Sequence, residues 1–420
     1  KPTAVSQVLE QFIRVGLIIL IAYFLVMRDY SNEIVAGGVM AGSIVGALAS
    51  LIYLRVTYGR STVKVQTGNP YSFNVFIKWG KRILSVSIPI AIGAVTMALL
   101  NFVDSFTIPF GLRVAGASTD EVNYIYGIYG RGLSLVQIAT VFATSIVLPL
   151  IPLITKKLAE QDGVAVRETI ERTHFMTHLV SWPAALGLLA LTLPLNLALF
   201  TNLEGSSMLA IIGFSSVFTS LTVLGTGILQ GMNVAKLGAM IIIGGVVLKV
   251  FTNIFLIQLF GLDGAAMSTL LVYLVLFIVN SVAIYKKMPE TFSASRPSAE
   301  KLEESRESGR ALTDDHTMIN PANLAEGEKK SPAVRKYRFI DSAVLKMVIS
   351  SIVMGVVIGL PTLYFAVEDW SRIMALGYAI LAIGIGALLY FGQLFILKVI
   401  DKETLRSFLG NRQKGGEKLE

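Results

Sequence analysis

Cysteine is absent from this chain of 420 residues, and charged side chains make up only 15% of it. Without cysteine, the protein has no disulfide framework, no thiolate nucleophile and no cysteine-ligated metal. Soluble domains carry about a quarter charged residues, so the shortage of charge argues against a soluble globular protein.

Motifs of common pumps and enzymes are missing as well. The stretches "GNPYSF" and "GTGILQG" lack the lysine and the hydroxyl residue that complete a phosphate-binding loop, which argues against an ATP-driven pump. We find no nucleophile elbow and no paired carboxylates within the apolar runs. Basic residues do not interleave with aromatic ones as they do on a nucleic-acid-binding surface. We therefore expect neither an enzyme nor a nucleic-acid-binding protein.

Hydrophobic sequence is abundant, at 54% of the chain, and the mean hydropathy is +0.67. A helix needs about 20 apolar residues to cross the hydrocarbon core. Only helices and closed barrels satisfy every backbone group in lipid, and the apolar runs are too long for barrel strands. The sequence predicts an all-α polytopic membrane protein with about ten transmembrane helices. The candidate spans are 11–28, 34–56, 83–103, 132–154, 175–200, 207–231, 237–259, 264–285, 343–366 and 373–398.

Lysine and arginine in the connecting segments predict the orientation of the spans. Segment 57–82 has five basic residues and no acidic one, so we expect it in the cytoplasm, together with 155–172. Segment 104–130 is predicted as an external loop, and the short connections 201–206 and 367–371 are poor in basic residues, as external loops are. Both ends of the ten spans are then cytoplasmic.

Two stretches interrupt the apolar pattern. In 58–82, Phe73, Phe76 and Trp79 lie close to lysines, which is typical of a helix on the inner membrane surface; a solvated loop is the alternative. Residues 288–340 are rich in Ser, Glu, Lys, Arg and Pro and lack apolar periodicity. We expect this second segment to be largely disordered.

Five stretches carry a resemblance to a known family: "KPTAVSQVLEQFIRV", "SIPIAIGAVTMALLNFVDSFTIP", "YGRGLSLVQIATVFATSIVLPLIP", "ILQGMN" and "NIFLIQLFGLDGAAMST". In their order and spacing they resemble the polysaccharide-exporter branch of the MOP flippases. Within that branch, the chain is most similar to the MurJ-like lipid II flippases and the stage V sporulation protein B-like proteins. The resemblance implies a multi-pass protein of the bacterial cytoplasmic membrane.

That family has fourteen helices, in two six-helix lobes around a central cavity followed by two further helices. The ten spans correspond to the last ten, so the resemblance implies that the first four helices are missing and that the first lobe is incomplete. Because the chain begins with lysine, we expect a fragment or a trimmed form of a longer protein. The predicted divisions are 1–57 (end of the N-terminal lobe), 58–82 (amphipathic linker), 83–287 (C-terminal six-helix lobe), 288–341 (disordered cytoplasmic linker), 342–400 (two additional helices) and 401–420 (cytoplasmic tail).

The function implied by the resemblance is a flippase for an undecaprenyl-pyrophosphate-linked saccharide, foremost lipid II, which works by alternating access as a monomer among membrane lipids. Another lipid-linked unit, teichoic, capsular or exopolysaccharide, is a close alternative. A drug–cation antiporter of the related MATE group is a weaker one, because it needs acidic residues deep in the cavity. An integral-membrane enzyme acting on lipid-linked sugars is weaker still.

Arg131 immediately precedes the apolar stretch 132–154 and stands between Gly130 and Gly132, on the predicted outer side of the membrane. A cation there is costly, and the positions one helical turn away hold no acidic residue. A guanidinium can hold a diphosphate through two parallel hydrogen bonds, and the flanking glycines leave room for the ligand. We predict that Arg131 binds substrate, as the family's cavity arginine on its eighth helix does. The alternative is an arginine that extends to the membrane interface.

Further candidates are weaker. Arg14 faces the cavity or extends to the cytoplasmic surface, and Gln230 lines the cavity or bonds to another helix. The resemblance implies a site for a monovalent cation such as sodium at Asp104, Asn253 and Thr269, and no other cofactor. Ile257 stands where that site has a second aspartate, and Asp104 alone fits a helix end at the outer surface. His174 and His178 share a helix face without a third zinc ligand, so we expect interfacial histidines and no metal site.

Overall fold

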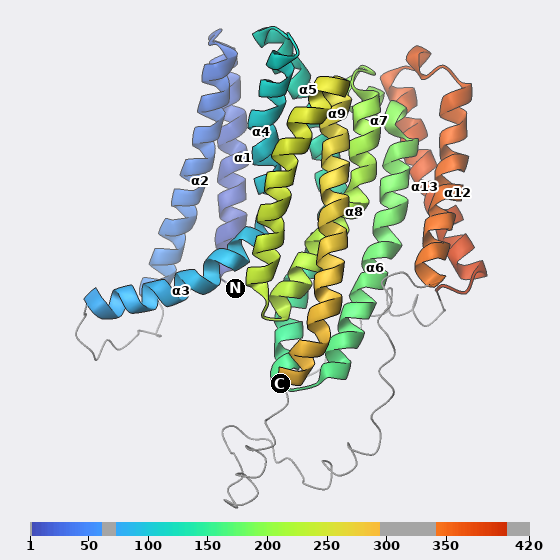
Figure 1. The fold of residues 1–420 in the computed structure, drawn as a ribbon. Helices are drawn as coiled ribbons and strands as arrows, with labels where there is room; N and C mark the ends of the chain where they lie inside the picture. Colours follow the sequence, from blue (N-terminus) through green and yellow to red (C-terminus); the bar gives the residue numbers. More distant parts are fainter. Residues whose placement is uncertain (1, 61–72, 295–341, 401–420) are drawn as a thin grey trace, which may run out of the picture. The chain divides into compact units, whose positions relative to one another are not determined.

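A computed structural model describes residues 2–60, 73–294 and 342–400, and Figure 1 shows that these are helical apart from short connections. The described part contains no β-strand, which confirms the predicted fold class. The chain divides into two compact units, residues 1–80 and 81–420. Most of the predicted linker 288–341 lies outside the described residues, although the preceding helix continues into it as far as Ala294.

The first unit contains the helical pair α1 (Pro2–Val26) and α2 (Asn32–Arg60). The two helices pack closely because small residues of α2 face α1. A Cβ atom added to Gly46 would lie 2.9 Å from the backbone oxygen of Glu10. Small residues at such contacts let membrane helices approach each other closely. The predicted spans 11–28 and 34–56 therefore correspond to two packed helices.

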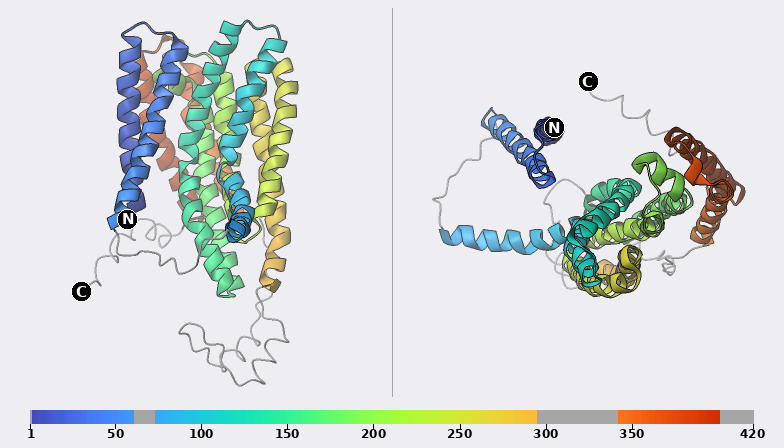
Figure 2. Two further views of the ribbon diagram at one scale, coloured as in Figure 1. Left: turned by 90° about the vertical axis from the view of Figure 1, so that its left-hand side faces the viewer. Right: turned by 90° about the horizontal axis from the view of Figure 1, so that it is seen from above.

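The second unit is built around α8 (Ser206–Gly231). In the apolar segment of α8 that is long enough to cross a membrane, 72% of the residues are buried. This helix packs against α5 (Thr119–Ala159), α6 (Gly163–Ala190) and α9 (Ala235–Ala294). Figure 2 shows α12 (Ser342–Tyr364) and α13 (Arg372–Ile396) at the edge of this unit, beside α6 and α7 (Thr192–Phe200). A single 3-10 turn, η1 (Val367–Asp369), lies between α12 and α13.

Length and composition identify seven described helices able to cross a membrane, or nine if each of two bent pairs is one span. One pair is α3 (Phe73–Ala94) with α4 (Thr96–Val114), bent by 68°, and the other is α6 with α7, bent by 74°. In the second pair, Pro194 has no N–H to donate to the previous turn, so the helix breaks just before it, at Leu191.

The predicted external loop 104–130 is wrong. Helix α4 continues to Val114 and α5 begins at Thr119, so only residues 115–118 connect them. The side chain of Ser118 accepts from the Glu121 backbone N–H, and the Glu121 carboxylate accepts from the Ser118 backbone N–H, which completes a capping box. With 41 residues, α5 is about 60 Å long at 1.5 Å per residue, twice the hydrocarbon thickness. A search for apolar runs finds only the part of such a helix that crosses lipid.

Helix α9 contains two of the predicted spans, 237–259 and 264–285, because it folds back on itself at Gly261. The backbone of Gly261 has φ 56° and ψ −130°, a conformation that favours glycine. Position 264 has no room for a side chain, because a Cβ added to Gly264 would lie 2.0 Å from the Leu256 carbonyl oxygen. The first arm (235–260) and the second arm (262–294) run side by side (Figure 1), and a hydrogen bond of 2.6 Å joins the hydroxyls of Thr252 and Ser268.

Candidate functional site

Five buried polar side chains from four helical segments meet inside the second unit. We call this group the Asp104 cluster. Its members are at most 5% exposed, which in a protein interior requires that their polar atoms find partners. They are Asp104 on α4, Tyr129 on α5, Lys249 and Asn253 on the first arm of α9, and Thr269 on its second arm.

The carboxylate of Asp104 is the centre of the cluster. The ammonium Nζ of Lys249 lies 3.2 Å from Asp104 Oδ1 and also donates to the hydroxyl of Thr269. Tyr129 donates its hydroxyl to Asp104 Oδ2 at 2.9 Å. Asn253 Nδ2 donates to two oxygen atoms, Asp104 Oδ1 and the hydroxyl of Thr107, each at 2.7 Å. Both carboxylate oxygens therefore accept hydrogen bonds, and one also contacts a cation.

Local sequence explains how these side chains converge. Lys249 and Asn253 are four residues apart, so they share one face of the first arm. The turn at Gly261 brings the second arm, with Thr269, against that face. On the facing helix α4, Asp104 and Thr107 are three residues apart and share a face too. The cluster thus depends on the fold-back of α9, which joins residues 20 positions apart in the chain.

The structure brings together the three residues predicted as an ion site, Asp104, Asn253 and Thr269. It also corrects one expectation: Asp104 lies in the middle of α4 and is 1% exposed, so it is not a helix-end residue at the outer surface. Ion binding itself stays a prediction.

Lys249 is the residue that sequence reasoning missed. It stands in "GGVVLKVFTNIF", within the predicted span 237–259, and its side chain is 1% exposed. A lone lysine inside an apolar span is costly and marks a functional position with a partner. That signal was sufficient to select Lys249, but only the tertiary structure identifies Asp104 as its partner.

Arg131 lies near the start of α5 and is partly buried. Its Nη1 donates to the amide oxygen of Asn202 at 2.7 Å, and its guanidinium carbon lies 5.1 Å from the centre of the Phe200 ring. Phe200 is the last residue of α7, where the helix dipole favours a cation. Both contacts are electrically neutral, and no salt bridge joins Arg131 to a carboxylate among the described residues. The arginine is held in place while its charge is not neutralised by an acid.

Residues 1–158 match a family model described as polysaccharide biosynthesis protein. The chain is 26% identical over 297 residues to the lipid II flippase MurJ of Bacillus subtilis (strain 168), covering 67% of this chain and 54% of that protein. It is 29% identical over 269 residues to the uncharacterized membrane protein YabM of the same strain, covering 64% and 50%. Among solved structures it is similar to lipid II flippase MurJ in an inward closed conformation, with a TM-score of 0.52, 13% identity, and coverage of 91% and 67%.

The chain is similar to the MurJ-like branch of the MOP superfamily. The resemblance carried by its sequence is thereby confirmed, as is its nature as a multi-pass membrane protein. This MurJ-like chain spans about half the length of the curated relatives it matches, 50% and 54%. The solved structure, at 13% identity, supports the fold alone.

The two glycines beside Arg131 have different surroundings in this MurJ-like chain. A Cβ added to Gly130 would meet no atom within 4 Å, so that side is open, as we expected for a ligand. At Gly132 an added Cβ would lie 3.2 Å from side-chain atoms of Met208 and Ile212 on α8. The small size of Gly132 therefore serves helix packing, and the prediction that it clears space for a ligand is wrong.

Gln230 is 8% exposed, and its Nε2 donates to the backbone oxygen of Ile90 on α3 at 3.2 Å. A Cβ at Gly93 would lie 1.9 Å from this nitrogen, so a larger residue there would displace the Gln230 amide from its present position. The contact favours the helix-to-helix alternative for Gln230, and its role in substrate binding stays a prediction.

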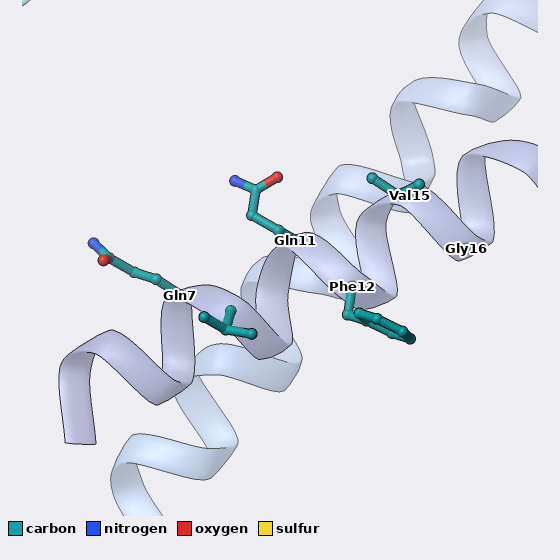
Figure 3. Close-up of a pocket in the computed structure, with 6 residues that line it drawn as sticks. Gln7, Gln11, Phe12, Val15 and Gly16 are labelled. Carbon is teal, nitrogen blue, oxygen red and sulfur yellow. The ribbon is translucent and has the colours of Figure 1, made fainter. Parts of the chain in front are cut away.

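In the first unit, Arg14 Nη2 forms a salt bridge of 2.6 Å with Glu10, one turn earlier on α1. A shallow groove along α1 is lined by Gln7, Gln11 and Phe12 among others, and Figure 3 shows both glutamine side chains on the same side of the helix. Arg14 is not among the lining residues. Its role in substrate binding stays a prediction.

His174 and His178 are 7% and 5% exposed, so both side chains are buried within the protein, and their position at the membrane interface stays a prediction. His178 Nδ1 accepts a hydrogen bond of 3.0 Å from Trp182 Nε1, so the rings of His178 and Trp182 are partners inside the protein. Within the described part of the chain, no third histidine or acidic side chain completes a metal-binding group with them.

Proposed function

We propose that this MurJ-like chain forms part of a flippase that moves a saccharide linked to a polyprenyl diphosphate across the membrane, with lipid II as its cargo. The family description and the name of the MurJ relative support this class of cargo. The protein carries the cargo without changing it covalently, so it is not an enzyme. It acts as a monomer among membrane lipids.

The observation that carries the proposal is the environment of Arg131. A partly buried guanidinium usually pairs with a carboxylate, which neutralises it. Here the partners are the Asn202 amide oxygen and the Phe200 ring, and both leave the positive charge intact. Most of the five N–H donors remain available for other acceptors. A diphosphate supplies the negative charge and the paired oxygens that a guanidinium fork accepts best.

Two bent helix pairs support transport by alternating access. The α3–α4 and α6–α7 pairs are bent by 68° and 74°, each at a short break. Discontinuous helices are common in transporters, where they border the substrate cavity and permit one part to move against another.

A different lipid-linked saccharide is the second candidate, because the family description names polysaccharide biosynthesis in general. A drug–cation antiporter is less well supported. Such a protein needs a buried carboxylate that accepts the cation, and the carboxylate of Asp104 already contacts the ammonium of Lys249.

The test uses the intact gene product in vesicles with a fluorescent lipid II analogue. We expect Arg131→Ala to slow translocation by about 10- to 100-fold, since a hydrogen bond to a charged group contributes about 1.5–3 kcal/mol. Arg131→Lys restores part of the rate, because an ammonium keeps the charge and loses the fork. Arg113→Ala is the matched control: this arginine is exposed in the last turn of α4, and its loss should leave the rate unchanged.

Normal transport by Arg131→Ala would contradict the assignment of this residue. The cargo is tested separately with a second vesicle preparation, which holds a polyprenyl-diphosphate-linked unit of another polymer. Faster translocation of that unit than of the lipid II analogue would contradict lipid II as the cargo and favour the second candidate.

A further inference from the structure

The Asp104 cluster contains the oxygen atoms that a small hard cation prefers: a carboxylate, hydroxyl groups and an amide oxygen. An ammonium group of the chain itself already lies among them. We propose that Lys249 is a tethered cation that takes the place of a metal ion in this cluster. The wild-type protein then binds no sodium here, and removal of the lysine side chain creates a sodium site. This inference goes beyond the proposed flippase function.

The contacts of Lys249 support the proposal because they are the contacts a metal ion would make. Its Nζ lies 3.2 Å from Asp104 Oδ1 and donates to the hydroxyl of Thr269. These are two of the three residues that the resemblance implies as cation ligands. The ammonium therefore already contacts the oxygen atoms of Asp104 and Thr269 that a sodium ion would need as ligands.

The third residue, Asn253, has an amide oxygen that could serve as a further ligand. Its Oδ1 is buried and accepts no hydrogen bond from any described residue. The amide orientation follows from Asp104: a turned amide would place Oδ1 against the carboxylate oxygen, at the 2.7 Å now occupied by Nδ2. A metal ion that neutralises the carboxylate removes this constraint, and the amide can then turn and offer its oxygen as a ligand.

Charge balance explains why the lysine and sodium exclude each other. Asp104 and Lys249 carry opposite formal charges, so the buried cluster is neutral as it stands. A sodium ion in addition would leave one uncompensated positive charge in a buried site, which is strongly unfavourable. The position one helical turn beyond Asn253 holds Ile257, which is 1% exposed and provides no second carboxylate to balance such a charge. With Lys249 replaced by a neutral residue, sodium restores neutrality.

The experiment measures thermal unfolding of the intact, detergent-solubilised protein in NaCl and in choline chloride at equal ionic strength. We expect the wild-type Tm to be the same in both salts. We expect Lys249→Ala and Lys249→Ser to have a lowered Tm in choline chloride that rises with each tenfold increase in NaCl, because a ligand that binds only the folded state stabilises it. Serine provides a second variant that keeps a hydrogen-bonding group in the cluster.

The control is Lys249→Ala combined with Asp104→Asn, which removes both charges and should show no specific response to sodium. A sodium-dependent Tm in the wild type would overturn the proposal, because the lysine would then not occupy the ion's place. Failure of sodium to stabilise both lysine variants, including failure of both to fold in any salt, would also overturn it. Folding of either variant in NaCl alone would support it.

Discussion

Loss of one charge from the buried pair Asp104–Lys249 should destabilise the protein more than loss of both. The perturbation is Lys249→Met, which keeps the length of the side chain without its charge, and Asp104→Asn, which keeps the shape of the carboxylate. The two substitutions are made singly and together. Each single variant leaves one buried charge without its partner, whereas the double variant leaves none.

The magnitude follows from the geometry of the pair. At 3.2 Å between Nζ and Oδ1, two unit charges attract each other by about 5 kcal/mol if the effective dielectric constant is about 20. Removing one member of a buried pair typically costs about 3–5 kcal/mol, because the remaining charge is still desolvated. The double variant avoids that cost, so we expect it to be more stable than the sum of the two single effects predicts, by about 3 kcal/mol or more.

The assay is unfolding in detergent micelles, followed by fluorescence of the three tryptophans. Choline chloride serves as the salt, because sodium would replace the missing lysine charge in the single variant. If the two single effects simply add up in the double variant, Asp104 does not stabilise the buried ammonium. Our explanation of why a lysine is tolerated inside a membrane span would then be wrong.

Three further predictions concern the fold. Gly264→Ala should destabilise by about 1–3 kcal/mol or more, because the new methyl group overlaps the backbone of Leu256 at the fold-back of α9; Gly244→Ala meets no atom within 4 Å and should be neutral or stabilising in the same unfolding assay. Cysteine scanning over 73–82 should show lipid-protected positions at helical spacing around Phe73 and Phe76, and uniform accessibility to water would contradict a surface helix. Deletion of 295–325 should leave membrane insertion and detergent stability intact, and loss of folded protein would contradict the predicted dispensability of this segment.

The fold class could be predicted from the sequence because lipid imposes a local requirement. Every backbone group in the hydrocarbon core must be satisfied within its own segment, so apolar runs of about 20 residues indicate helices. The ends of the helices escaped that reasoning. The extension of α4 to Val114 and the start of α5 at Thr119 are determined by capping and by turns outside the membrane, where hydropathy carries no signal.

The candidate site was predicted only in part, for a physical reason. Arg131 could be selected because its own helix offers no acidic partner, and the resemblance pointed to Asp104, Asn253 and Thr269. The neutral partners of Arg131, Phe200 and Asn202, lie about 70 residues away in the chain, as the separation of 71 from Asn202 shows.

Sequence by itself indicated a helical membrane protein that resembles the MurJ-like branch, with Arg131 at the head of one span and Asp104 at the end of another. Only the tertiary structure decided that Asp104 pairs with Lys249. Whether Asp104 contacts a metal ion or the chain's own ammonium depends on the fold-back at Gly261, which places the two arms of α9 together. It depends equally on how α4 packs against those arms, since Lys249 and Asp104 are 3.2 Å apart only in the folded protein. Electrostatic interactions act through distance in space, and a linear sequence contains that distance only for residues within a few turns of one helix.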